Sequence, residues 1–369
     1  MRTLICLIGL SAVAAAQSPT KFPTKMYVGA WPGRLLVIDE ATAAYEGDIP
    51  LKTGVVRGTF LTKDHQRMVV TTVKDSGIEV VDLRSKAVLS SFTLNEGNKK
   101  VRLRGTAVDP DGKMMYAIAK EVTKGIDRFT IGTNKFYVID IEQQKVVKTV
   151  DPPKEEVDTL GGFMRLSPDG KTLYVFGQNI LVFDTTDFKL KEKIELQKTY
   201  SMADTLSLGG DLDPWGDPAI MTSSFISTDP IVHRSVFGIA RIDLDKRKFE
   251  FHPVGPVGGM PGAGWSVSSS LQVTPDRKTG YAIAVEGEHG NRVTQFLVFD
   301  MEKLKLVKRK EFAGRTRFSF AISSTGKQLY IYGAGNTIEV FDADTLTLTK
   351  TIEVNGDMTS SLAVVISSN

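Results

Sequence analysis

One unit of turns and strands recurs seven times along the 369-residue chain, and this repeat limits the possible folds more than any other feature. The clearest copy has a Ser-Pro-Asp-Gly-Lys turn at residues 167–171, apolar strands at 173–176 and 180–184, and an alternating Lys-rich strand at 190–196. The second apolar strand of each copy ends in an aspartate. These seven aspartates are Asp39, Asp82, Asp140, Asp184, Asp243, Asp300 and Asp342.

The spacing of the aspartates predicts the fold class. Successive copies lie 42 to 59 residues apart, and a four-stranded propeller blade takes about 40–45 residues, so the longer spacings contain insertions. We therefore predict an all-β, seven-bladed β-propeller of four-stranded blades, with almost no helix and no second domain. The chain has no Gly-His…Trp-Asp signature, which excludes a WD40 protein.

The two ends of the repeat predict how the ring closes. The first copy begins at residues 25–29, already at the second strand of the unit. Its missing inner strand is expected from the apolar residues 362–366. Pairing the C-terminal strand into blade 1 would remove the two open sheet edges that otherwise invite aggregation.

Residues 1–16 have the features of a secretory signal peptide. Arg2 precedes an apolar run at residues 4–13, and three alanines at 14–16 form a small-residue cleavage site. An uncleaved anchor is the alternative, although spanning a membrane takes roughly 18 apolar residues. The only cysteine is Cys6, so the remaining domain, residues 17–369, has no disulfide or thiolate ligand. We expect a periplasmic or secreted protein without membrane insertion.

The predicted connections are long on one face of the ring. We letter the strands A to D from the axis outward. The A–B and C–D connections then share one face, called the A–B face, and the B–C and D–A connections share the other, called the B–C face. All long segments are expected on the B–C face: 120–134, 223–235 and 286–294 between B and C, and 151–162, 197–217 and 255–267 between D and A. This elaboration predicts a binding face, with drift in tolerant loops as the alternative.

Arginines mark the expected channel mouth on the B–C face. Arg57 and Arg104 both precede Gly-Thr just ahead of strand A in adjacent blades, and Arg317 lies near the same register in blade 7. Such arginines could bind an anionic group or the carboxylates of a partner. They could equally bridge neighbouring blades through buried carbonyls. Both interpretations stay open on the sequence.

Four further residues complete the candidates for a partner or ligand face. Trp215 and Trp265 are expected to be apolar anchors for a partner, since binding energy concentrates in a few Trp, Tyr and Arg side chains. The alternative is that both tryptophans pack between blades. Arg128 lies in the long segment 120–134 and His233 in the long segment 223–235.

Catalytic and metal-binding motifs are sparse. No histidine is spaced from a second ligand as a metal motif requires, so the loop with Glu286, Glu288 and His289 is interpreted as a solvated polar loop. The aspartates around Pro214 lack the spacing of a calcium loop and are interpreted as a turn cluster. No Gly-x-Ser-x-Gly or phosphate-binding loop occurs. A net charge of +3 gives no case for nucleic-acid binding.

The blade sequences resemble a known family. Leu-Tyr-Val at 173–175 and Leu-Tyr-Ile at 329–331 resemble the YVTN-type repeats of exported bacterial propellers. More specifically, the mature chain resembles the β subunit of quinohemoprotein amine dehydrogenase over all seven blades. The resemblance includes the long segment before residues 136–140, the stretch 219–225 and the tail 319–363.

The resemblance implies a division of labour among subunits. The propeller would help to wall the active site and dock its partners, while the quinone and the c-type hemes would belong to partner subunits. The mature chain lacks cysteine for a cysteine–tryptophan quinone and Cys-x-x-Cys-His for heme, so we expect no bound cofactor, no metal and no catalytic activity of its own. One alternative is a stand-alone YVTN-type propeller that binds a protein, glycan or surface polymer. A weaker one is a hydrolase or lactonase with a metal at the channel mouth.

Overall fold

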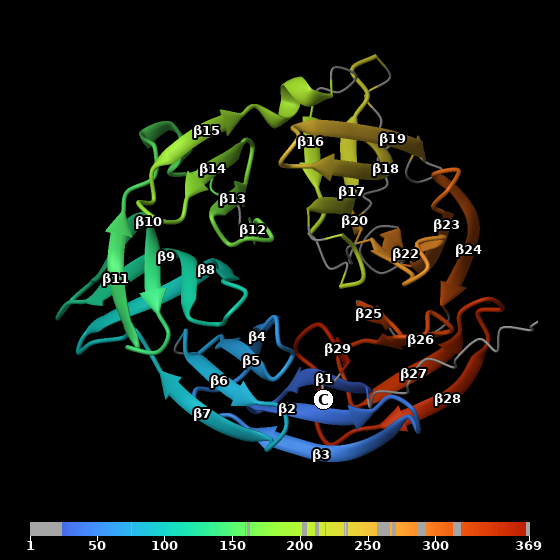
Figure 1. The fold of residues 1–369 in the computed structure, drawn as a ribbon, viewed down its shortest axis with the longest axis horizontal. Helices are drawn as coiled ribbons and strands as arrows, with labels where there is room; N and C mark the ends of the chain where they lie inside the picture. Colours follow the sequence, from blue (N-terminus) through green and yellow to red (C-terminus); the bar gives the residue numbers. More distant parts are fainter. Residues whose placement is uncertain are drawn as a thin grey trace, which may run out of the picture.

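Seven antiparallel sheets are arranged as blades around a central axis (Figure 1). The computed structural model describes residues 24–366 apart from residues 75, 159, 161–162, 201–204, 211–213, 218, 232, 234, 257–265, 268–270, 287–292 and 313–318. The predicted signal peptide and Cys6 lie outside the described residues. The prediction of a seven-bladed, all-β propeller is confirmed.

Blades 1 to 3 each contain four strands, which follow one another from strand A at the axis to strand D at the rim. Blade 1 consists of β29 (Ala363–Ile366), β1 (Thr24–Ala30), β2 (Arg34–Asp39) and β3 (Ala44–Pro50). Blade 2 consists of β4 (Val56–Leu61), β5 (Arg67–Thr72), β6 (Ile78–Asp82) and β7 (Ala87–Phe92). Blade 3 consists of β8 (Lys99–Val108), β9 (Met114–Lys124), β10 (Phe129–Asp140) and β11 (Lys145–Val150).

Blades 4 to 7 repeat the order, and only blade 6 has a divided inner strand. Blade 4 consists of β12 (Phe163–Leu166), β13 (Thr172–Phe176), β14 (Ile180–Asp184) and β15 (Leu190–Ile194). Blade 5 consists of β16 (Thr205–Leu208), β17 (Ile220–Thr228), β18 (Ser235–Asp243) and β19 (Lys248–Pro256). Blade 6 consists of β20 (Ser266–Val267), β21 (Gln272–Val273), β22 (Thr279–Glu286), β23 (Val293–Asp300) and β24 (Lys305–Phe312). Blade 7 consists of β25 (Ser319–Ile322), β26 (Gln328–Tyr332), β27 (Thr337–Asp342) and β28 (Leu348–Glu353).

Helix is nearly absent, as predicted. The described part of the chain contains two 3-10 turns, η1 (Lys154–Glu156) and η2 (Leu196–Thr199). No helix among the described residues combines the length and the apolar character that crossing a membrane takes.

The ring closes in blade 1 as predicted. β29 pairs antiparallel with β1, and the register places Ala363 opposite Tyr27 and Val365 opposite Lys25. Ser360, just before β29, accepts a hydrogen bond from the Gly29 backbone N–H at 2.8 Å. The C-terminal strand therefore supplies the inner strand that the N-terminal part of the chain lacks.

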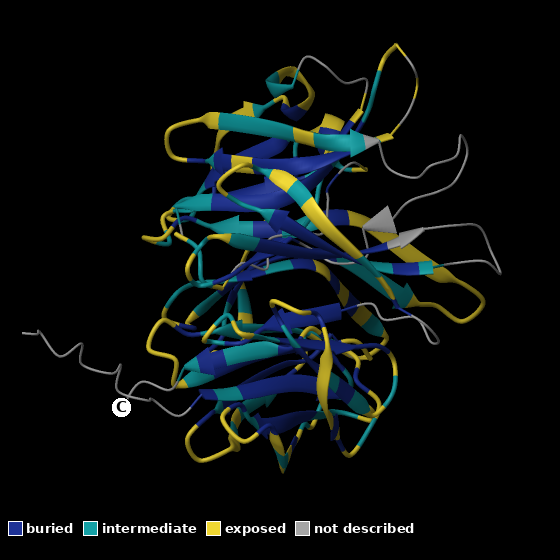
Figure 2. Cartoon of the chain, turned by 90° about the vertical axis from the view of Figure 1, so that its right-hand side faces the viewer, coloured by how far each residue is buried: buried dark blue, intermediate teal, exposed yellow. Residues whose placement is uncertain are grey.

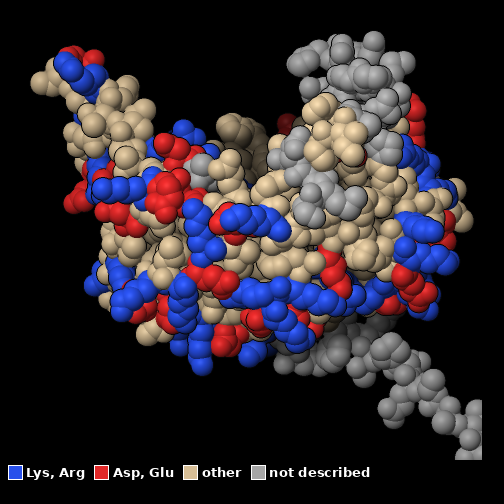
Figure 3. Space-filling model, turned by 90° about the horizontal axis from the view of Figure 1, so that it is seen from above, with Lys and Arg blue, Asp and Glu red and all other residues tan. Residues whose placement is uncertain are grey.

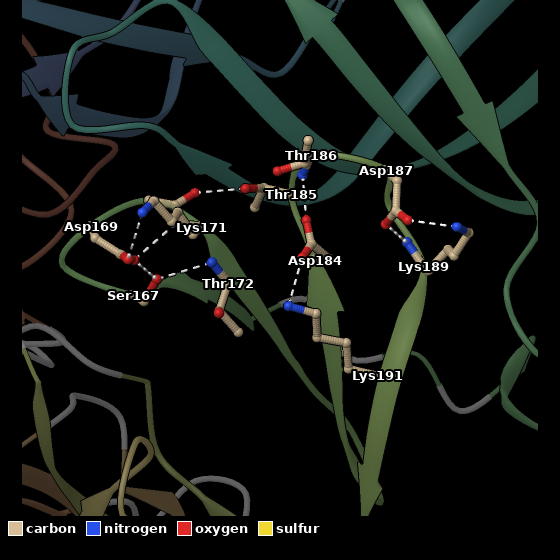
Figure 4. Close-up of polar contacts among 11 residues, drawn as sticks. Ser167, Asp169, Lys171, Thr172, Asp184, Thr185, Thr186, Asp187, Lys189 and Lys191 are labelled. Carbon is tan, nitrogen blue, oxygen red and sulfur yellow. Dashed lines mark hydrogen bonds and ion pairs between the residues drawn. The ribbon is translucent and has the colours of Figure 1, made fainter.

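The recurring aspartates have a structural role in the C–D turns. Each of the seven is the last residue of strand C, and in blade 4 the Asp184 carboxylate accepts the Thr186 backbone N–H at 2.7 Å and contacts the Lys191 ammonium at 2.5 Å (Figure 4). The fourth residue after each aspartate is a non-glycine residue with positive φ. These residues are Ala43, Lys86, Gln144, Phe188, Arg247, Leu304 and Leu346. The repeat thus encodes one turn geometry seven times.

The A–B turns share a second geometry. In blade 4 the Ser167 hydroxyl contacts the Asp169 carboxylate at 2.6 Å and accepts the Thr172 N–H at 2.9 Å (Figure 4). Gly170 has a φ of 71° in this turn, and in blade 2 the equivalent left-handed position is taken by His65, with a φ of 55°. The His65 ring Nδ1 lies 3.0 Å from the carbonyl oxygen of Ile366. This histidine therefore connects the turn of blade 2 to the closing strand.

The apolar core lies between neighbouring blades. One cluster joins Val69 and Ile78 of blade 2 to Val101 and Ile139 of blade 3, all less than 4% exposed. Figure 2 shows the middle strands of the blades as largely buried. The outer strand β15 is mostly exposed, as its alternating Lys-rich sequence predicts. Each blade buries its apolar side chains only by packing against its neighbours, as is usual in repeat architectures, and is therefore not stable alone.

Buried carboxylates add polar contacts between blades. Glu79 in β6 is 0% exposed. It accepts the backbone N–H groups of Lys52 and Thr53 at 2.8 and 2.6 Å and the Thr53 hydroxyl at 2.6 Å. These contacts fix the connection between blades 1 and 2. Glu40 similarly accepts the Ser324 N–H at 2.7 Å, which links blade 1 to blade 7.

Two predicted B–C loops are wrong, because strands continue into them. β9 extends to Lys124 and β10 begins at Phe129, so residues 120–134 form mostly strand, with a turn at 125–128. β17 likewise reaches Thr228 and β18 begins at Ser235. Valine, threonine, isoleucine and phenylalanine favour strands in the first of these segments.

The predicted D–A segment 197–217 is also wrong. It contains β16, the inner strand of blade 5, so the D–A connection ends before Thr205 and residues 209–219 form an A–B connection. The A–B face therefore carries one long connection. In the segment 151–162 the structure has the turn η1. The central parts of the predicted segments 255–267 and 286–294 lie outside the described residues, as does His289.

Candidate functional site

Blade 3 extends beyond the ring as a three-stranded arm. The arm comprises residues 99–103 of β8, 119–124 of β9 and 129–135 of β10, joined by the turn 125–128. Figure 3 shows it as a projection that stands clear of the body, at the upper left. The Lys124 N–H donates to the Asn98 carbonyl at 2.9 Å, and the Gly125 N–H donates to the Arg128 carbonyl at 2.8 Å. Backbone hydrogen bonds thus continue along the arm as far as its tip.

The pairing register assigns side chains to the two faces of the arm. Arg102 pairs with Lys120, and Val122 pairs with both Lys100 and Ile131. Because paired residues point to the same face and alternate along each strand, one face collects four cations and three apolar residues. We call it the cationic face, and it consists of Lys100, Arg102, Lys120, Val122, Lys124, Phe129 and Ile131.

The opposite face of the arm joins the protein core. Val101, Leu103 and Ala119 are buried in the cluster between blades 2 and 3. Farther out, the Glu121 carboxylate accepts the Tyr137 hydroxyl and lies 3.5 Å from the Lys99 ammonium. Burial, and secondarily the hydrogen bond to Glu121, raise the pKa of Tyr137. Glu121, the one acidic residue within the paired strands of the arm, is therefore on this face.

Arg57 bridges blades 2 and 3 at the base of the arm. It lies inside β4 at a register shift, and Arg104 lies at a matching shift in β8, so both are within strand A rather than ahead of it. The Arg57 guanidinium donates to the carbonyl of Leu103 and, at 2.5 Å, to that of Arg104. The structure therefore shows carbonyl bridging for Arg57. Its pKa is lowered because burial desolvates the guanidinium and because Arg102 and Arg104 lie close by.

The other predicted candidates are divided among several places. Arg128 is exposed at the tip of the arm, 2.8 Å from the Asp127 carboxylate. His233 is exposed in the B–C connection of blade 5, with a φ of 49°. Trp215 lies in the A–B connection of blade 5, so its predicted position on the B–C face is wrong. Trp265 and Arg317 lie outside the described residues.

Sequence reasoning missed the exposed apolar residues of the B–C face. Large exposed apolar side chains among the described residues form two groups. One group lies on the outer strands: Leu89, Val147, Leu190, Val307 and Leu348. The other group lies at the B–C ends of the blades: Trp31, Val73, Ile126, Phe129, Ile131 and Ile231. Trp31, 61% exposed, could have been found from the turn signal of Trp-Pro-Gly.

A cavity of about 290 Å³ lies in the central channel. Its wall is largely apolar, with inner-strand residues such as Leu61 and Val365, and includes Pro214 of the long A–B connection. A second hollow, between blades 2 and 3 on the A–B face, mixes cations such as Lys63 with carboxylates such as Asp111. Neither gathers a recognisable catalytic constellation.

The described residues do not fit a metal centre or the cofactors of the resembled family. No group of three His, Cys, Asp or Glu residues in the described part of the chain could hold a metal ion. A thioether-linked quinone or a c-type heme needs cysteine, and Cys6, the only cysteine of the sequence, precedes the described residues. The described residues therefore include no cysteine to which either group could be attached.

Comparison with known proteins shows the fold. No protein-family model and no curated protein matches the chain. A functionally unknown protein from Desulfotomaculum acetoxidans has a TM-score of 0.55 at 15% identity, covering 93% of this chain and 99% of that one. The dihydro-heme d1 dehydrogenase NirN, in complex with DHE, has a TM-score of 0.56 at 13% identity, and the match covers 94% of this chain and 75% of that one. Apo AztD from Citrobacter koseri has a TM-score of 0.52 at 13% identity, and the match covers 94% of this chain and 99% of that one.

Proposed function

We propose that this protein is a scaffold that docks a partner protein on the B–C face of the propeller. The observation that carries the proposal is the one-sided exposure of large apolar side chains. Apart from the outer strands, such side chains are exposed among the described residues only at the B–C ends of the blades. Exposed apolar side chains that lie close together, as Ile126, Phe129 and Ile131 do in the arm, mark interaction sites because leaving them in water is unfavourable.

The arm of blade 3 is the centre of the proposed interface. Ile126, Phe129 and Ile131 are 107%, 65% and 66% exposed, and the strands that carry them are hydrogen-bonded along their length. A preorganised surface loses little conformational entropy when a partner binds. Aromatic side chains and arginines are typical energetic anchors of interfaces, and the arm supplies Phe129 together with Arg102 and Arg128.

The resemblance gives this scaffold a specific form. We propose an exported subunit like the β subunit of a periplasmic amine dehydrogenase, which shapes an active site whose quinone and hemes belong to partner subunits. The signal-like residues 1–16 support export. The seven-bladed fold and the missing cysteines support a non-redox role. The ring would hold the partner's reactive groups and exclude water around them.

Co-purification from the native cell envelope tests the docking face. We expect Ile126→Ser and Phe129→Ser to lose the co-purifying subunits while the melting temperature of the propeller is kept, since both side chains are exposed. Leu89→Ser and Val307→Ser on outer strands are the matched controls and should retain them. Loss of partners from the outer-strand variants alone would place the interface on the perimeter and refute the proposal.

Spectroscopy of the purified chain tests the non-redox role. The chain alone should show no heme or quinone absorbance and no amine-dependent dye reduction, and the intact complex should show all three. Turnover of an amine by a verified single-chain preparation would overturn the assignment to a scaffold subunit.

The cationic face favours one alternative, a stand-alone propeller that binds an anionic surface polymer. Lys100, Arg102, Lys120 and Lys124 lie on this one face. In that case a purified acidic polysaccharide would bind more tightly than any protein of the cell envelope, and the amine-dehydrogenase partners would be absent.

A further inference from the structure

The arm exposes the edge of a strand. β10 pairs with β9 from Phe129 onward, whereas β11 pairs with β10 only from Phe136. Among the described residues, no strand pairs with the outer edge of β10 between Phe129 and Lys135. Such an edge presents backbone N–H and C=O groups to another chain, and folded proteins usually cover or twist it away.

The cationic face of the arm carries an internal repulsion. Arg102 and Lys120 are directly opposite each other in the β8–β9 pair, and like charges at such positions are destabilising. Among the described residues, no carboxylate lies within ion-pair distance of Arg102, Lys120 or Lys124. Arg57 and Arg104 add positive charge at the base of the arm. This arrangement costs stability and offers binding sites for carboxylates.

Apolar side chains share the face with these cations. Phe129 and Ile131 are on the strand whose edge is exposed. A segment that added to this edge would place every second side chain on the same side of the sheet, directly beside Phe129 and Ile131 of β10. Lys120 and Lys124 of β9 lie one strand farther in, within reach of long side chains that lean across β10. Its complementary sequence would therefore combine acidic residues with apolar ones.

We propose that the arm binds an extended acidic segment of a partner protein, which pairs as an added strand with the edge of β10 and directs its carboxylates toward Lys120 and Lys124 of the cationic face. The inference rests on the proposed docking function and adds the chemistry and the binding mode. Main-chain pairing would supply affinity and alternate side chains would supply specificity. Charge complementarity would speed association and reject basic partners. An exposed strand edge favours a polypeptide over a polysaccharide or nucleic acid.

A synthetic probe peptide tests the binding mode. The probe is a fluorescein-labelled ten-residue peptide that alternates glutamate with valine or leucine, and its binding is measured by fluorescence anisotropy at low and physiological salt. We expect at least a tenfold loss of affinity when glutamine replaces glutamate. We expect a similar loss when alternate backbone nitrogens are methylated, because methylation blocks strand pairing. Hydrogen exchange of Phe129 to Lys135 should slow in the presence of the probe.

Variants of the cationic face test the charge contacts. Lys120→Gln and Lys124→Gln in β9 should each weaken probe binding several-fold and reduce its salt dependence, whereas their melting temperatures should be unchanged or higher. Lys305→Gln, in exposed β24 of blade 6, is the matched control and should bind the probe normally. Equal binding by the methylated peptide would refute strand addition. Unchanged binding by both cationic-face variants would refute the carboxylate contacts.

The outcomes separate this inference from the proposed function. If Ile126→Ser abolishes co-purification but the probe binds without charge dependence, the docking face stands and the acidic segment is refuted. If heparin or an oligonucleotide binds more tightly than the probe and competes with it, the face recognises an anionic polymer and the inference is overturned. If the Ile126→Ser protein instead keeps its co-purifying partners, the docking face and the acidic segment are both refuted.

Discussion

Replacing Glu79 should destabilise the propeller more than any exposed substitution, because three donors depend on its carboxylate. The side chain is 0% exposed, and its Oε1 atom accepts the N–H groups of Lys52 and Thr53 and the Thr53 hydroxyl. Glu79→Ala would leave these partly buried groups without their acceptor. Each orphaned buried donor costs roughly 1–3 kcal/mol. The Thr53 hydroxyl keeps a contact with the Thr72 hydroxyl at 3.0 Å, so the two backbone groups dominate and we expect a loss of about 3–5 kcal/mol.

Glu79→Gln separates hydrogen bonding from charge. All three donors reach Oε1, so an amide oxygen in the same place can accept them, although the Lys52 N–H also lies 3.1 Å from Oε2, where the glutamine NH2 group would face it. The loss should therefore be about 1–2 kcal/mol, as charged acceptors become neutral and this second contact is lost. Urea unfolding followed by far-UV circular dichroism measures both variants. Glu311→Ala, on exposed β24, is the control and should leave the midpoint unchanged. A loss below about 1 kcal/mol for Glu79→Ala, or equal losses for the two variants, would refute the reasoning.

Three further predictions concern closure, turns and pH. Deleting residues 358–369 removes β29 and should abolish soluble expression; a soluble truncation with a cooperative melt would contradict closure through blade 1. Gln144→Gly relieves a φ of 56° and should stabilise the protein by about 1 kcal/mol, whereas Lys145→Gly in β11 should destabilise it by a similar amount, both measured by urea unfolding. Hydrogen bonds from Lys25 and Thr42 lower the pKa of Asp39 to about 2, and those from Lys191 and Thr186 do the same for Asp184. The contribution of these carboxylates to stability is present above the unfolded pKa near 3.8 and is lost toward pH 2, so the melting temperature should fall over this interval. A melting temperature that stays constant between these pH values would show that the two carboxylates do not stabilise the fold.

The blade count and the closure could be predicted from the sequence because one local rule repeats. Each aspartate ends strand C and accepts a backbone N–H of the following turn, as Asp82 accepts that of Ser85 at 2.6 Å. The residues that make this geometry are adjacent in the chain, so their pattern survives in the sequence. The strand at residues 363–366 is identifiable because blade 1 otherwise lacks an inner strand.

The corrected elements lack that local signal. β16 has only four residues, Thr205–Leu208, and is followed by an eleven-residue A–B connection instead of a Pro-Asp-Gly turn. The sequence favours a loop for the arm because the turn residues Gly125 and Asp127 interrupt the apolar pattern. The alternation of Phe129 and Ile131 in β10 is an available strand signal, but the length of the segment suggests an insertion.

The candidate site is only partly accessible to sequence reasoning. The shared Arg-Gly-Thr of Arg57 and Arg104 correctly indicates equivalent positions in adjacent blades. It cannot reveal that the Arg57 guanidinium is directed to the backbone of Leu103 and Arg104, because that contact depends on how two blades pack. The cationic face similarly depends on the register between β8 and β9 and is not visible in either strand alone.

The pairing of β29 with β1 also sets an order of events for the newly made chain. Blades 2 to 7 consist of consecutive strands, so the four strands of each blade become available together and can pack as soon as a neighbouring blade is present. Blade 1 has its three outer strands first and its inner strand last. During synthesis the exposed side of β1 must therefore wait for the final strand, and the ring becomes a closed, mutually supported whole only in the last step.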